Sequence, residues 1–307
     1  MGPLLCLVSA ACFGAMGIFG KLAYQAGVSP SALLLLRFTL AAALLGLLLV
    51  MRPGLRRRIP MSVHRGGRAR LALTALGLGA IGYATQAALY FSALERIDAS
   101  LVSLVLYTYP LLVTLAAALL GRERLTPGRS AGVVLASGGT LLVLLGAGGV
   151  RFDVIGVALA FGAAVTYTVY ILVADTVVHR LPPAVLSVLV MTGAALALAT
   201  RGLVAGGIHL GFGAAGWFWV GCIALVSTVT GMLAFLAGLR RTGPSTAAIL
   251  STFEPVVTTA LAARTLNEFL TPVQLAGGLV VLSSVAVLQL RPQPAARRSA
   301  DAAGVPV

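Results

Sequence analysis

Apolar residues follow one another along most of this chain in blocks of about twenty, and short polar segments separate the blocks. A helix that spans a membrane needs roughly 20 predominantly apolar residues. The first block has no basic residue before it and further blocks after it, so we interpret it as a spanning helix and not as a cleaved signal peptide. The pattern predicts an all-α integral membrane protein with ten transmembrane helices, at residues 3–20, 30–51, 71–93, 99–120, 130–149, 154–174, 182–200, 214–239, 245–264 and 272–290.

The composition agrees with a membrane protein and argues against a soluble domain. Hydrophobic residues make up 59% of the chain and charged residues 10%, whereas soluble domains contain roughly 45–50% apolar and about 25% charged residues. The three cysteines and three histidines are scattered. Their spacing matches neither a metal site nor a disulfide framework, so we expect no metal and no cofactor.

The basic residues give the predicted helices an orientation. Seven arginines lie within the loop at 52–70, and with the N-terminus inside the cell sixteen of the 22 basic residues fall on cytoplasmic segments. Positive charge accumulates on the cytoplasmic side of membrane proteins and attracts anionic lipid headgroups. We therefore expect a multi-pass protein of the cell (inner) membrane with both termini in the cytoplasm. We do not interpret the net charge of +14 as a sign of nucleic-acid binding, because aromatic residues do not alternate with the basic ones.

The two halves of the chain repeat each other. The segment YPLLVTLAAALLGRERLTPGRSAG at 109–132 aligns without a gap to EPVVTTALAARTLNEFLTPVQLAG at 254–277, an offset of 145 residues. From the shared proline to the final glycine, 10 of 23 positions are identical. Each half holds five predicted spans, an odd number, so the second half enters the membrane from the opposite side, as in many secondary transporters. We predict repeats at 1–149 and 150–291 and a disordered cytoplasmic tail at 292–307.

These motifs resemble a known family. Phe-Glu-Pro at 253–255, followed by Glu-x-Leu-Thr-Pro at 268–272, resembles the EamA-type repeat of the drug/metabolite transporter (DMT) superfamily, and the first copy carries Tyr-Pro at 109–110 and Glu-x-Leu-Thr-Pro at 123–127. The resemblance implies two inverted five-helix EamA repeats in which the fifth and tenth helices pack outside the pore. It also implies a small-metabolite transporter, often an exporter of amino acids. The chain departs from the pattern at Arg122 and Asn267, where the family usually has glycine, and at Tyr109, where the second copy has a carboxylate.

Two charged residues lie inside predicted spans. Glu254 is ~14 Å from the start of its span at 1.5 Å per residue, and a charge at such depth costs about 2.5–3.5 kcal/mol unless it faces a cavity. Glu254 could couple transport to protons, bind a substrate ammonium group, or join helices as a structural residue. Arg37, ~10 Å deep, could bind a substrate carboxylate, pair with a helix end or with Glu254, or extend its head group outward.

A proline interrupts the fourth span of each repeat. Pro255 cannot donate a hydrogen bond to the carbonyl of Ser251, and Pro110 cannot donate one to that of Leu106. Each of these helices should therefore be bent or loosened near its middle. The matched positions favour a hinge, and a kink that improves packing is the alternative.

Polar side chains recur at helical spacing on several spans. Tyr83 and Gln86 share a face, and Tyr107, Tyr167 and Thr228 lie on others. We interpret these residues as candidates for lining a cavity that suits an amphipathic organic solute, although hydroxyl groups also join helices to one another.

The sequence as a whole favours a secondary transporter of small organic metabolites, with alternating access around a midplane site and membrane lipid as its surroundings. No nucleotide-binding loop occurs, so we expect solute gradients or protons to drive transport. An intramembrane enzyme and a non-transporting membrane sensor are the alternatives, and a homodimer is as compatible with the sequence as a monomer.

Overall fold

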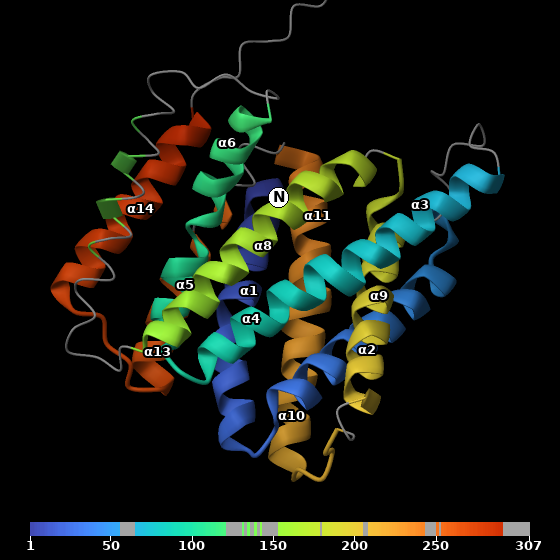
Figure 1. The fold of residues 1–307 in the computed structure, drawn as a ribbon, viewed down its shortest axis with the longest axis horizontal. Helices are drawn as coiled ribbons and strands as arrows, with labels where there is room; N and C mark the ends of the chain where they lie inside the picture. The colour runs from blue at the N-terminus through green and yellow to red at the C-terminus, as the bar shows by residue number, and fades with distance from the viewer. Residues whose placement is uncertain are drawn as a thin grey trace, which may run out of the picture.

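The computed structural model of the chain is a bundle of helices (Figure 1). It describes residues 1–55, 65–120, 153–178, 180–204, 208–242, 250–251 and 253–290, together with isolated residues between 131 and 142. These residues contain no strand. The predicted span at 130–149 falls mostly outside this part of the chain, as do residues 56–64 of the arginine loop, Glu123 and the tail at 292–307.

The helices follow the predicted apolar blocks. Six of those described are long and apolar enough to cross a membrane, whereas the total of ten remains a prediction. The helices are α1 (Gly2–Gln25), α2 (Pro30–Met51), α3 (Arg65–Gly77), η2 (Leu78–Tyr83), α4 (Ala84–Leu94), α5 (Ala99–Leu106), α6 (Tyr109–Leu119), α8 (Val154–Val178), α9 (Pro183–Val204), α10 (Ala214–Cys222), η4 (Ile223–Thr230), α11 (Gly231–Thr242), α13 (Phe253–Thr265) and α14 (Pro272–Leu290), with a short 3-10 turn η1 (Pro53–Leu55) after α2.

Local sequence explains where helices start and stop. Gly27 adopts φ +83° between α1 and α2, a conformation that glycine accepts without steric cost. The Ser29 side chain then accepts a hydrogen bond from the Ala32 amide and caps α2. Asp153 caps α8 through the amide of Ile155, at 2.8 Å. Its hydrogen bond from Arg96 is the main reason that the pKa of Asp153 lies below its ordinary value.

The predicted fourth span is interrupted. Helix α5 ends at Leu106 and α6 begins at Tyr109, directly before Pro110. At the break the Thr108 hydroxyl donates to the carbonyl of Val105 at 2.8 Å. The helix is therefore broken beside this proline, as expected from its missing amide, whereas a hinge motion there remains a prediction.

The third span of each repeat contains a π-helical segment. Segment η2 begins at Leu78 and η4 at Ile223, which is the same 145-residue offset that relates the two sequence repeats. Each segment continues directly from an α-helix and into another, α3–η2–α4 and α10–η4–α11. The two repeats therefore share a local helix defect as well as a motif.

Two helices from the fourth spans of the two repeats run in opposite directions. At one end the amide of Ala99, the first residue of α5, donates to Glu268, which follows the end of α13. At the other end Tyr107 contacts Ser251, just before α13 begins. Helices α5 and α13 are thus antiparallel, which is the relation that inverted repeats require.

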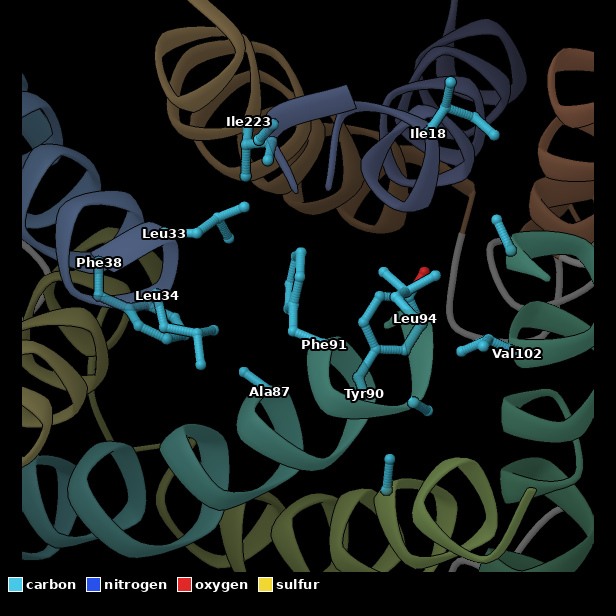
Figure 2. Close-up of a cluster of buried hydrophobic side chains, with 14 of the residues drawn as sticks. Ile18, Leu33, Leu34, Phe38, Ala87, Tyr90, Phe91, Leu94, Val102 and Ile223 are labelled. Carbon is cyan, nitrogen blue, oxygen red and sulfur yellow. The ribbon is translucent and has the colours of Figure 1, made fainter. Parts of the chain in front are cut away.

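One end of the bundle is filled by apolar side chains. Figure 2 shows Phe91 between Leu33 of α2, Ile223 of η4 and Ile18 of α1, and these side chains are fully or almost fully buried. Helix α1 packs along both α11 and α13. Helix α14 lies at the edge of the bundle (Figure 1), and a Cβ at its Gly278 would lie 3.1 Å from the Leu104 side chain of α5.

Candidate functional site

A cavity of about 330 Å³ lies among the helices of both repeats. Residues from the first two turns of α9 and from the last turns of α8 line it, so it extends toward the end of the bundle where these two helices meet. The opposite end is closed by the apolar cluster of Figure 2. The cavity is thus sealed at one end.

Tyrosine dominates the cavity wall. Four ring contacts connect five tyrosines in a row: centroids are 5.6 Å apart for Tyr107–Tyr109, 4.8 Å for Tyr109–Tyr167, 5.9 Å for Tyr167–Tyr170 and 5.4 Å for Tyr170–Tyr83. We call these five residues the tyrosine wall. Tyr90 also lines the cavity, so six of the seven tyrosines of the chain meet there. Such a surface offers ring faces to apolar or cationic groups and hydroxyl groups to polar ones.

Arg37 lies at one end of the tyrosine wall. The residue is 2% exposed, its Nε donates to the Thr228 hydroxyl at 3.0 Å and its Nη2 to the Tyr83 hydroxyl at 3.4 Å. Its guanidinium carbon is 5.0 Å from the centre of the Phe38 ring. No carboxylate of the described residues lies within ion-pair distance of it. The pair with Glu254 that the sequence left open does not form in this structure.

Glu254 lies at the other end of the tyrosine wall. Its Oε2 is 3.1 Å from the Tyr107 hydroxyl, and the same hydroxyl donates to the carbonyl of Ser251. Because Pro255 has no amide hydrogen, it cannot donate the helical hydrogen bond to this Ser251 carbonyl. Tyr107 therefore supplies the donor that the proline lacks, and places its oxygen against the one carboxylate in the cavity lining of the described residues.

The lining shows the internal symmetry of the chain. Four pairs of lining residues are separated by 145 positions, the offset of the repeat: Leu106 and Ser251, Tyr109 and Glu254, Ala87 and Met232, Tyr90 and Phe235. The two repeats therefore contribute equivalent positions to one shared cavity.

Most of the residues proposed from the sequence meet at this cavity. Six candidates line it, namely Glu254, Arg37, Tyr83, Gln86, Tyr107 and Tyr167. Thr228 is not part of the lining, but its hydroxyl accepts the hydrogen bond from Arg37 Nε. Tyr109 and Tyr170 were not proposed as site residues. For Tyr109 the signal was available, because it occupies the position of Glu254 in the first repeat.

A polar cluster joins the two repeats at the closed end. Lys21 Nζ is 2.6 Å from Glu268 Oε1 and 3.8 Å from Asp98 Oδ1, and Glu268 Oε2 accepts the amide of Ala99 at 2.8 Å. We call Lys21, Asp98, Ala99 and Glu268 the polar latch. Burial raises the pKa of Glu268 above its ordinary value, although Lys21 and the Ala99 amide act in the opposite direction.

Replacing Lys21 with methionine should destabilise the protein by about 1–2 kcal/mol, because a partly buried carboxylate loses its cation. The pKa of Glu268 rises further in this variant, so its ionisation opposes folding more strongly, and the deficit grows as the pH rises through that pKa. Thermal unfolding in detergent at several pH values measures the effect. Arg96→Met, which breaks the more exposed Arg96–Asp153 pair, is the control and should have a smaller effect; equal losses would contradict the prediction.

Comparisons with known proteins agree with this architecture. The model of the EamA-like transporter family matches residues 1–145 and 154–290. An uncharacterized transporter, YcbK of Bacillus subtilis, is 28% identical over 284 residues, covering 90% of this chain and 88% of the relative. The aromatic amino acid exporter YddG of Ancylobacter novellus is 33% identical over 183 residues, which is 56% of this chain and 60% of that protein.

A solved crystal structure has the same fold. It superposes with a TM-score of 0.65 at 22% identity and covers 93% of this chain and 95% of its own. The family match spans both halves of the chain, and the described helices include six of membrane-spanning length and hydropathy. The chain is therefore a multi-pass membrane protein that belongs to the EamA-like transporter family.

Proposed function

We propose that this protein is a secondary transporter that exports small amphipathic organic solutes, amino acids among them, across the cell membrane. The observation that carries the proposal is the cavity with the tyrosine wall between a buried guanidinium, which has no ion-pair partner among the described residues, and a carboxylate. A buried charge is costly unless a partner compensates it. A zwitterionic solute supplies partners for both ends at once.

The chemistry of the cavity favours an aromatic amino acid as solute. The Arg37 fork would bind the carboxylate, and Glu254 with the nearby tyrosine faces would bind the ammonium group. The body of the solute would pack on the tyrosine wall. The partial similarity to a protein named as an aromatic amino acid exporter supports the same solute class.

Alternating access is the mechanism that fits the internal symmetry. Equivalent positions of two antiparallel repeats line one cavity, and inverted repeats of this kind exchange conformations in many transporters. The charge distribution of the loops supports a cytoplasmic location for the end where α8 and α9 meet, and the polar latch would then close the outer end. Opening to the outside would break the latch and bend the chain near Pro110 and Pro255.

Counterflow in proteoliposomes tests the proposal. Vesicles preloaded with phenylalanine should accumulate labelled phenylalanine. Phenylalaninamide, which lacks the carboxylate, and 3-phenylpropionate, which lacks the ammonium group, should each compete about ten-fold more weakly, since each loses a charge-assisted contact. Empty liposomes are the control. Absence of counterflow with every amphipathic solute tried, from either side, would refute the proposed function.

A further inference from the structure

Arg37 is held by two residues that are equivalent in the repeats. Its hydrogen-bond acceptors, Tyr83 and Thr228, are 145 positions apart, the offset that relates the two halves. Each is the sixth residue of its π-helical segment, counted from Leu78 in η2 and from Ile223 in η4. A single arginine on α2, without a second copy, therefore touches matching positions of both repeats.

The π-helical turns explain how those positions reach Arg37. A π-helical turn accommodates one residue more than an α-helical turn, which rotates the following side chains by about 100°. Such segments are often found at functional sites. In η4 the Thr228 hydroxyl donates to the carbonyl of Ile223, five residues earlier, at 2.9 Å. Its proton is committed there, so only its lone pairs are free to accept from Arg37.

The packing places this contact between the repeats. Helix α2 of the first repeat packs on η4 of the second, and α9 of the second repeat packs on η2 of the first. The hydrogen bonds from Arg37 thus join both π-helical segments across the boundary between repeats. Among the described residues, these two hydrogen bonds use two of the five N–H groups of the Arg37 guanidinium. The arginine itself lines the cavity.

We infer that Thr228 and Tyr83 are positioning residues for Arg37: they fix the plane of the guanidinium across the repeat boundary, so that its remaining N–H groups present a fork to the solute carboxylate. The inference rests on the proposed function. It assigns to Thr228 a part in carboxylate recognition although Thr228 does not line the cavity. Carboxylates match a fixed guanidinium fork in geometry.

Substitutions at Thr228 test the inference when the KM of a solute with a carboxylate is compared with the KM of a solute without one. Thr228→Val removes the hydroxyl at nearly constant shape and should raise the KM for phenylalanine about ten-fold, because a hydrogen bond to a charged group is lost. The KM for phenylalaninamide should change less than about two-fold. Thr228→Ser, which keeps the hydroxyl, should restore the phenylalanine KM. Tyr83→Phe should shift it in the same direction but less, because its contact is longer.

The matched control is Thr166→Val. Among the described residues, the Thr166 hydroxyl donates to the carbonyl of Gly162 on its own helix and to no other helix, so this variant should leave both KM values unchanged. Equal KM changes for phenylalanine and its amide in Thr228→Val, or no rescue by serine, would overturn the inference while transport by the unmodified protein still stood. If the unmodified protein transports neither solute and carboxylates do not raise its Tm, the proposed function fails and this inference fails with it.

Discussion

Replacing Gly79 with alanine should prevent stable folding, or lower the Tm in detergent by about 10 °C. A Cβ added at Gly79 would lie 1.9 Å from the carbonyl oxygen of Val190, and one at Gly193 would lie 2.1 Å from that of Leu76. These are backbone atoms of two helices in mutual contact, so no side-chain rotation relieves the overlap. Overpacking typically costs about 1–3 kcal/mol, and we expect at least the upper value here.

Gly77→Ala provides the control for this prediction. Gly77 is two residues away in the continuous helix formed by α3, η2 and α4, and a Cβ there meets nothing within 4 Å. Alanine should raise stability slightly, by up to about 1 kcal/mol, through its better helix propensity. Detergent-solubilised yield and thermal unfolding distinguish the two variants. Similar behaviour of Gly77→Ala and Gly79→Ala would mean that η2 and α9 do not approach each other as described.

Replacing Arg37 with glutamine should reduce phenylalanine counterflow by about 100-fold or more, the loss expected when one partner of a buried charge pair is removed. Stability should stay constant or increase, because the substitution removes a buried cation that has no counter-ion among the described residues. This combination separates a solute-binding role from a structural one, which would lower the Tm and the transport of all solutes together.

The control for Arg37 is Arg201→Gln. Arg201 is exposed near the end of α9, so its substitution should leave counterflow and Tm unchanged. Counterflow of phenylalaninamide in Arg37→Gln should fall less than that of phenylalanine. An Arg37→Gln protein that transports phenylalanine normally would exclude the guanidinium from solute binding.

The sequence was sufficient to predict an all-helical membrane protein built from two repeats, whereas the number of ten helices stays a prediction. Apolar blocks of spanning length and the shared proline-to-glycine frame are properties of local sequence, and both appear in the fold. The charged residues at Arg37 and Glu254 stand out in such blocks by type alone. Depth along a span does not fix lateral position, however, so the sequence could not decide whether these two residues pair.

Other features of the site depend on irregular helix geometry. The π-helical segments shift the register by a residue, so regular helical spacing does not bring Tyr83 and Thr228 to one arginine. The break at Tyr107–Thr108 places the Tyr107 hydroxyl against Ser251 and Glu254. Tyr109 could have been predicted as a site residue, because it is the residue of the first repeat that is equivalent to Glu254. Equivalent positions of inverted repeats face the same interface.

Protection of a cavity cysteine by solute tests the central claim most directly. In a variant with Cys6, Cys12 and Cys222 replaced by alanine, Ala174→Cys places a thiol in the cavity lining, toward the end of the bundle where α8 and α9 meet. We expect a membrane-impermeant thiol reagent to label it from the cytoplasmic side, and phenylalanine, more than phenylalaninamide, to slow that labelling. Labelling that proceeds at the same rate with and without a solute that the same protein transports would show that the solute binds elsewhere.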